Sequence, residues 1–396
     1  MKKIWGLLLA FLLLIVVFLP ATSIHLMKST KDDVDELYFG VTFDGQSAEE
    51  FMPIIDKVKN YTNLFVITSW SIATNQTALY MVCDYIADAN LYFIVFFAFI
   101  SQKTYPWHQQ WLHDAVNEQR WGDKFIGIYL NDEHGGKQID AKEAFTYAKD
   151  YDDAAKQFVQ TVKYGLTGQS TSMIDLKNKD IKLFTSDYVL QWWVYLSDYD
   201  VVFTELGWNI TASRQIALGR GAATMQNKDW GTIITWETTT PPYLGNNEQI
   251  YRYMIESYRA GAKYITLFNY PTYPENNPYG MLSDEHFEVI RQFWQYTKTY
   301  PRSSYGTIKV DTALVLPQNY GWGMRRSNHI INDPIWGLWP EDEKAPLILE
   351  KVEFMETRYN LQFDIIYEDP QTNPTEKYTN IIYWNTTTLI NNTQKR

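Results

Sequence analysis

Acidic residues stand where short apolar stretches of this 396-residue chain end, and this spacing is the first indication of chemistry. Six carboxylates are placed in this way: Asp44, Asp132, Glu133, Asp187, Glu205 and Glu237. Carboxylates gathered in one hollow repel each other, and repulsion together with burial raises the pKa of at least one of them. A protonated carboxyl can then give its proton to a leaving oxygen, while an ionised neighbour attacks carbon or activates water. Such chemistry requires a fold that brings these distant stretches together.

Aromatic residues lie beside the same positions. Phe, Trp and Tyr make up 16% of the chain, including 15 Trp and 29 Tyr, and this excess calls for a use besides core packing. Sugar rings have apolar C–H faces that stack on indole and phenol rings. We therefore expect a carbohydrate-binding cleft. Its expected substrate-binding residues are Trp70, Tyr129, Asn131, Asp187, Trp208, Trp236 and Tyr243. The alternative for each ring is ordinary packing.

From residue 37 onward, short apolar runs alternate with longer amphipathic ones, which predicts eight strands that are each followed by a helix. The predicted strands cover residues 37–44, 64–70, 91–100, 125–131, 181–187, 201–205, 231–237 and 264–270. The predicted helices cover residues 77–89, 107–118, 141–164, 192–196, 213–226, 248–260 and 284–300, and a further helix opens at Ser47 with Glu50 as its capping-box partner.

Eight such units within residues 37–300 have the size and order of a (β/α)8 TIM barrel. An open doubly wound sheet is the rival architecture, and it usually carries a glycine-rich first turn. Residues 43–46 read FDGQ and lack that turn, so the barrel is favoured. Residues 304–396 predict a small α/β appendage, with strands at 310–316, 363–367 and 380–384 and a helix at 345–359.

In a barrel of this kind, chemistry takes place at the carboxyl ends of the strands, and side chains alternate between the two faces with period 2. This period places Tyr129, Asn131 and Glu133 on the inner face of the fourth strand. It places Glu205 on the inner face of the sixth strand and Glu237 on that of the seventh. The alternative for Glu205 is a salt bridge with Arg214 or Arg220, which are expected on a solvent-facing helix. Asp132 has the opposite parity, which also allows it only to cap a turn.

The chain resembles the (β/α)8 glycoside hydrolases in residues 129–136 (YLNDEHGG), 203–209 (FTELGWN) and 235–237 (TWE). In the large retaining clan of these enzymes, an Asn-Glu pair ends the fourth strand and supplies the acid/base, and a Glu ending the seventh strand is the nucleophile. The resemblance therefore implies hydrolysis of glycosidic bonds by two carboxylates without a cofactor. Residues 131–133 are one longer than that pair, so the acid is Asp132 or Glu133, and its partner is Glu205 or Glu237.

Composition excludes several other classes. A net charge of −11 argues against a nucleic-acid partner, because binding phosphates requires a basic surface. The single cysteine, Cys83, rules out a disulfide framework, and the six His lack zinc-binding spacing, so we expect no metal site. Two further alternatives stay open: a catalytically inactive carbohydrate-binding barrel, and a cell-envelope scaffold marked by large exposed apolar patches.

Residues 1–22 contain two lysines followed by an apolar run, which predicts an export signal or a short uncleaved membrane anchor. Either one would place the rest of the chain outside the cytoplasm, in the extracellular space or on the outer face of the membrane. Sequons at Asn60, Asn75, Asn209, Asn385 and Asn391 agree with export. The expected partners are an oligosaccharide or polysaccharide substrate and, through residues 1–22, the membrane.

Overall fold

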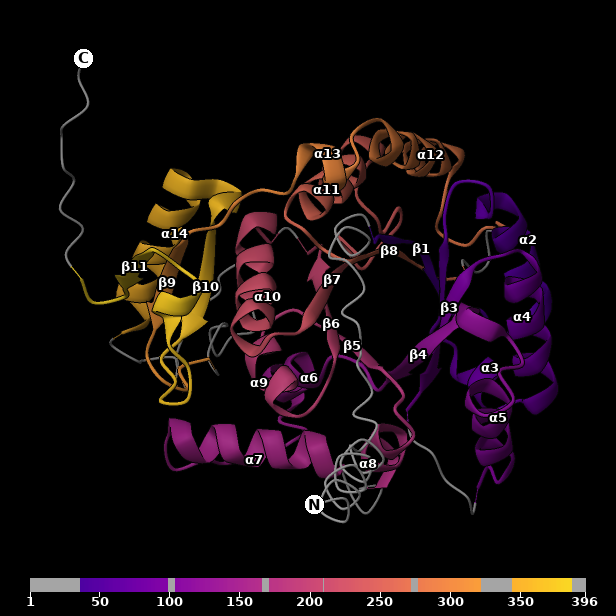
Figure 1. Ribbon diagram of the computed structural model, residues 1–396, viewed down its shortest axis with the longest axis horizontal. Helices are drawn as coiled ribbons and strands as arrows, with labels where there is room; N and C mark the ends of the chain where they lie inside the picture. The colour runs from indigo at the N-terminus through magenta and orange to yellow at the C-terminus, as the bar shows by residue number, and fades with distance from the viewer. Residues whose placement is uncertain are drawn as a thin grey trace, which may run out of the picture. The chain divides into compact units, whose positions relative to one another are not determined.

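The computed structural model describes residues 36–98, 104–165, 171–208, 210–271, 277–321 and 344–386. Eight parallel strands close into a barrel in sequence order, as Figure 1 shows. They are β1 (Tyr38–Phe43), β2 (Leu64–Ile67), β3 (Tyr92–Phe97), β4 (Phe125–Leu130), β5 (Leu183–Asp187), β6 (Val201–Leu206), β7 (Asp229–Ile234) and β8 (Tyr264–Asn269). The predicted barrel is confirmed.

Helices follow the strands around the barrel. They are α2 (Ala48–Val58), α3 (Trp70–Ala73), α4 (Gln76–Asp88), α5 (Trp107–Val116), α6 (His134–Ala141), α7 (Tyr151–Tyr164), α8 (Thr171–Asn178), α9 (Gln191–Leu196), α10 (Ala212–Gln226), α11 (Asn247–Arg259), α12 (Asp284–Thr299) and α13 (Arg302–Tyr305). The predicted capping box is wrong, because the Ser47 side chain caps no N–H group and Glu50 instead accepts from the backbone of Gln46. A capping box does form at Ser283 and His286, where α12 begins.

The inside of the barrel is filled by apolar and aromatic side chains that alternate with those facing the helices. The buried inner set is Leu64, Val66, Ile94, Tyr129, Phe184, Val201, Phe203, Ile233 and Tyr264. Ile128 and Leu130 belong instead to the cluster between the strands and the helices. This division confirms the predicted parity of Tyr129, and it leaves room for a site only above the inner layer, at the carboxyl ends of the strands.

The C-terminal part forms a second, small parallel sheet in the order β10-β9-β11, and the small α/β appendage predicted there is confirmed. Its strands are β9 (Thr312–Leu316), β10 (Phe363–Tyr367) and β11 (Asn380–Tyr383), and α14 (Ala345–Tyr359) connects the first two in sequence. Alternating hydrophobicity in this segment was sufficient to predict α14 and β10 with their observed bounds.

The barrel helix α10 lies between β6 and β10, so it is covered on both sides (Figure 1). A Cβ added to Gly219 would lie 1.8 Å from Thr204 Oγ1, and one added to Gly221 would lie 2.4 Å from the Ile365 carbonyl oxygen. Glycine therefore permits close packing on both faces. The prediction that Arg214 and Arg220 lie on a solvent-facing side of this helix is wrong, because both are buried. Arg214 pairs with Glu356, and Arg220 pairs with Asp364.

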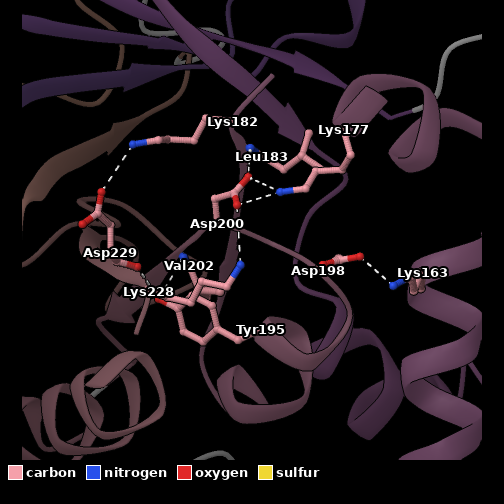
Figure 2. Close-up of polar contacts among 10 residues, drawn as sticks. All are labelled: Lys163, Lys177, Lys182, Leu183, Tyr195, Asp198, Asp200, Val202, Lys228 and Asp229. Carbon is pink, nitrogen blue, oxygen red and sulfur yellow. Dashed lines mark hydrogen bonds and ion pairs between the residues drawn. The ribbon is translucent and has the colours of Figure 1, made fainter. Parts of the chain in front are cut away.

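Ion pairs link the amino ends of β5, β6 and β7, at the end of the barrel opposite the strand carboxyl termini (Figure 2). Asp200 accepts from Lys177 Nζ at 2.7 and 2.8 Å and from the Leu183 N–H at 2.9 Å. Asp229 lies 3.3 Å from Lys182 Nζ and 3.1 Å from Lys263 Nζ. Contacts at this end of a (β/α)8 barrel contribute to stability rather than to catalysis.

Within the described residues, no helix is both long and apolar enough to cross a membrane. The predicted export signal or anchor at residues 1–22 lies outside the described residues.

Candidate active site

A cavity of about 490 Å³ opens at the carboxyl ends of the barrel strands. Four carboxyl groups line it: Asp44 after β1, Asp132 and Glu133 after β4, and Glu205 on β6. Its other lining residues are Thr68, Trp70, Phe96, Tyr129, Lys137, Ser186, Trp208, Ile233, Thr235, Trp236 and Phe268. Each of the eight strands, or the segment that directly follows it, contributes at least one of these lining residues, so the fold gathers acidic and aromatic side chains into one hollow, as the sequence led us to expect.

The turn after β4 directs two consecutive carboxylates into this cavity. Asn131 and Glu133 both adopt left-handed backbone conformations, with φ of 57° and 47°. Such angles end the alternation of a strand, so neighbouring side chains no longer point to opposite faces. As a result, Asp132 lines the cavity beside Glu133 despite its opposite parity in the sequence.

One serine connects the carboxylates of two strands. Ser186 Oγ on β5 lies 2.9 Å from Asp132 Oδ1 and 2.7 Å from Glu205 Oε1. Asp132 Oδ1 also accepts from the Tyr129 hydroxyl at 2.6 Å. A serine hydroxyl has one proton, so it can satisfy both carboxyl groups only by donating to one and accepting from the other when that one is protonated. The shared hydroxyl therefore brings the Asp132 and Glu205 carboxyl oxygens to within about 6 Å of each other, close enough for each group to affect the pKa of the other.

Burial and mutual repulsion favour the protonated forms of Glu133 and Glu205. Burial, and then the charges of Asp132 and Asp187, raise the pKa of Glu133 to about 7. Burial, and then the charges of Glu133 and Asp132, raise the pKa of Glu205 well above its ordinary value, and Glu205 is only 4% exposed. The charge of Glu133 is itself one of the causes that raise the pKa of Glu205, so the two groups do not titrate independently.

No arginine neutralises this acidic group among the described residues. Arg214 and Arg220 are engaged by Glu356 and Asp364, so the predicted alternative of a salt bridge to Glu205 is wrong. Lys137 is the one cation among the described lining residues, and its Nζ donates to the Asp132 carbonyl oxygen at 2.6 Å. The Lys137 charge lowers the pKa of Glu133 but does not outweigh burial.

Aromatic side chains form one wall of the cavity at the ends of β6 and β7. The rings of Trp208 and Trp236 stack, with centroids 6.2 Å apart and planes inclined at 26°. The backbone N–H of Trp208 donates to the backbone carbonyl oxygen of Trp236 at 2.7 Å. Gly207 allows this approach, because a Cβ there would lie 2.4 Å from the same oxygen. Two separate strand ends thereby hold one paired indole surface.

Trp70 forms part of the wall on the side of β2. It begins α3, whose N-cap Ser69 accepts from the Ile72 N–H at 3.1 Å, so a capped helix turn fixes its backbone. Its ring is 45% exposed and meets the Tyr105 ring edge to face. Exposed indole next to a cavity is suited to stacking on a ligand.

The structure places Glu237 outside the cavity, contrary to its predicted position. The strand β7 ends at Ile234, so the alternation that predicted an inward Glu237 does not extend to it. Glu237 Oε1 accepts from Gln249 Nε2 at 2.8 Å and from the Tyr253 hydroxyl at 3.1 Å, both on α11. Of these two glutamates, Glu205 lies in the cavity with the carboxylates that follow β4, and Glu237 does not.

Three other expected ligand-binding residues, Asp187, Asn131 and Tyr243, lie outside the cavity lining. Asp187 is buried beneath the site, where it accepts from the N–H groups of Gly135, Val189 and Leu190. Asn131 lines a small neighbouring hollow instead of the main cavity. Tyr243 packs its ring against Trp236 from outside, with centroids 5.3 Å apart. Tyr129 reaches the cavity with its hydroxyl, while its ring is buried in the barrel.

Gly135 and Gly136 explain why two glycines follow Glu133. A Cβ on Gly135 would lie 2.6 Å from Asp187 Oδ1, and one on Gly136 would lie 2.3 Å from the Tyr188 ring. His134 is held beside them by a 2.8 Å contact between its Nε2 and the Tyr199 hydroxyl. Burial lowers the pKa of His134 to about 3, so its imidazole is neutral near neutral pH.

Sequence reasoning missed Ser186 and Lys137. Parity on β5 could have identified Ser186, because Phe184 faces the barrel interior and Ser186 follows it by two residues. Lys137 had no such signal, since it lies on α6, whose start depends on the left-handed turn at Glu133. Within the described residues, no group of three or more His, Cys, Asp or Glu is arranged to hold a metal ion.

No family model and no curated protein matches this chain. Solved structures with a similar fold include an orotidine 5'-monophosphate decarboxylase from Methanocaldococcus jannaschii (10% identity, 66% of this chain and 98% of that chain, TM-score 0.35). They also include a truncated 3-deoxy-D-arabino-heptulosonate 7-phosphate synthase from Thermotoga maritima (10%, 69% and 89%, 0.36). A third is a GH10 endoxylanase retrieved from a sugarcane soil metagenome (10%, 67% and 100%, 0.38). These proteins have unrelated activities, and similarity at this level assigns none of them to this chain.

Proposed function

We propose that this protein is a glycoside hydrolase that cleaves glycosidic bonds with carboxyl groups at the mouth of its barrel. The observation that carries the proposal is the unneutralised set of Asp132, Glu133 and Glu205 in one cavity with a stacked pair of indoles. Such a set supplies a protonated carboxyl and an ionised one at the same place, and indole rings suit the apolar faces of sugars.

Glu133 is the proposed general acid. A pKa of about 7 keeps roughly half of it protonated at neutral pH, and it lies at the mouth, where it can reach the oxygen of a leaving sugar. Protonation of that oxygen allows its bond to the anomeric carbon to break as positive charge develops on the sugar ring.

Asp132 is the proposed second carboxylate. Two hydroxyl groups, those of Tyr129 and Ser186, contact its Oδ1 and orient it. In its ionised form it can attack the anomeric carbon or take a proton from an attacking water molecule. We propose that Glu205 exchanges protons with Glu133 and Asp132. Its pKa depends on the charge of Glu133, and it is linked to Asp132 through the Ser186 hydroxyl.

Amide variants test the proposal on a panel of glycans. We expect Glu133→Gln, Asp132→Asn and Glu205→Gln to lose roughly 10²–10⁴-fold in kcat, as removal of an acid or base usually does. Glu237→Gln is the matched control, because the same change is made on a carboxyl that contacts α11 instead of the cavity. It should retain activity within about twofold, a difference of less than 0.5 kcal/mol in the barrier.

Leaving groups separate the two roles. An aryl glycoside with a good leaving group needs little protonation, so it should restore most of the rate to Glu133→Gln but not to Asp132→Asn. For natural glycans, the wild-type rate should fall as pH rises above about 7, where Glu133 loses its proton. If the wild type cleaves no glycan, or if all three cavity variants match it, the glycosidase proposal is overturned. Binding without cleavage would instead indicate the inactive carbohydrate-binding barrel.

Action outside the cytoplasm stays a proposal, which rests on the sequence of residues 1–22 and on the sequons. Of those sequons, Asn60 and Asn385 are exposed, and Asn75 caps α4 with its side chain. Fractionation of cells that produce the full chain, with detection of the barrel in membrane and secreted fractions, tests this location.

A further inference from the structure

Asp44 is the carboxylate of the cavity that the proposed reaction does not use. It follows β1 directly, and its N–H donates to the Asn269 carbonyl oxygen on β8 at 3.2 Å, which fixes its backbone. Its side chain lines the cavity, yet it makes no hydrogen bond or ion pair with any described residue. A charged group left in this way at a cavity wall is available to a ligand.

The surroundings of Asp44 are negatively charged and aromatic. Asp132 acts on it across the mouth, and together with burial it raises the pKa of Asp44 to about 6. The strands on both sides of β1 contribute aromatic lining residues, Trp70 after β2 and Phe268 on β8. A sugar ring that stacks there would bring its substituents close to the Asp44 carboxylate.

The charges that line the cavity favour some sugar substituents over others. The described lining residues include four carboxyl groups and one cation, Lys137, whose ammonium already donates to the Asp132 carbonyl oxygen. A uronate, sulfate or phosphate would meet repulsion and no guanidinium. An ammonium group would be attracted, and a carboxylate that pairs with it would no longer be disfavoured by burial.

We propose that the substrate is a sugar bearing a free amino group, and that Asp44 is the specificity-determining residue that binds this group as an ammonium. The proposal rests on the glycosidase function proposed above and names the substrate class of that site. An N-acetylated sugar lacks the positive charge and adds bulk, so it should bind more weakly at the same place.

Binding of small probes tests the proposal without knowledge of the linkage. The probes are the methyl glycosides of glucosamine, galactosamine and mannosamine, each with its N-acetyl and its hydroxyl counterpart, titrated calorimetrically into the wild type. We expect at least one amine to bind 10-fold or more tightly than both counterparts, a difference of about 1.4 kcal/mol. This preference should decrease as salt concentration rises.

Asp44→Asn should reduce the amine preference to within twofold, and a circular dichroism spectrum and a urea midpoint like those of the wild type would show that the variant is folded. Asp88→Asn, at an exposed position on α4 outside the cavity, removes the same charge and should keep the preference.

Equal or tighter binding of the neutral counterparts in all three series, or tighter binding of a methyl uronide, would overturn the amino-sugar proposal. If neutral glycans are then cleaved in a Glu133-dependent manner, the glycosidase proposal still stands. If the amines bind preferentially but no glycan is cleaved, the amino-sugar binding site is supported and the glycosidase proposal is overturned. Absence of binding by every probe and of cleavage of every glycan would overturn both.

Discussion

Glu205 on β6 and Ser186 on β5 lie 2.7 Å apart between Oε1 and Oγ, and the same hydroxyl contacts Asp132. This hydrogen bond lowers the pKa of Glu205 against the larger effect of burial. Ser186 therefore holds two carboxyl groups in position and moderates the proton affinity of one of them.

Replacement of Ser186 tests this positioning role. Ser186→Ala should reduce kcat about 10-fold or more and move the alkaline limb of the pH–rate profile to higher pH, because Glu205 loses a hydrogen bond that lowers its pKa. Ser186→Thr keeps a hydroxyl and should restore the position of that limb. An alanine variant with reduced rate but an unmoved limb would mean that Ser186 serves packing alone.

The raised pKa values also predict how stability depends on pH. In the folded chain the pKa is about 7 for Glu133 and about 6 for Asp44 and Asp187, against ordinary values of 4.5 and 3.8. Groups with raised folded pKa values stabilise the fold fully below their unfolded pKa, and this contribution is lost as pH rises through the folded value. The unfolding free energy should therefore fall between about pH 4 and pH 7, by about 3 kcal/mol for Glu133 alone.

Urea unfolding at pH 4.5, 6 and 7.5 measures this dependence. Glu133→Gln should show a shallower loss of unfolding free energy over this range than the wild type, because a neutral amide does not titrate. Glu237→Gln, with its altered side chain outside the cavity, should keep the wild-type slope. Parallel curves for the wild type and Glu133→Gln would contradict the predicted linkage.

A buried ion pair joins the barrel to the C-terminal sheet and should be important for stability. Arg220 is 5% exposed and Asp364 1% exposed, and Arg220 Nε donates to Asp364 Oδ1 at 2.7 Å. Arg220→Ala should cost about 3–5 kcal/mol of unfolding free energy, because it leaves a buried carboxylate without its counterion.

The exposed pair of Arg291 and Glu288 is the matched control. Its 2.6 Å contact is at least as short, yet Arg291→Ala should cost less than about 1 kcal/mol, because water screens both charges. Urea midpoints for the two variants measure the difference. Similar losses would show that contact distance, and not burial, determines the strength of these pairs.

The sequence determined the barrel and much of its inner surface. Alternation of apolar stretches with amphipathic ones fixed the order of strands and helices, because each element must bury one face. Period-2 parity correctly placed Tyr129 inside, and it placed Glu205 at the cavity because β6 continues in regular form to Leu206. Such patterns are local, so they can be recognised without knowledge of distant contacts.

Tertiary structure decided where regular strands end and what covers each helix. Asp132 enters the cavity through the left-handed turn after β4, and Glu237 leaves it because β7 stops at Ile234. The arginines of α10 are buried because β10 and α14 of the C-terminal part pack on that helix. Backbone angles at a strand end and contacts between segments about 140 residues apart depend on packing of the whole chain, which no local periodicity records.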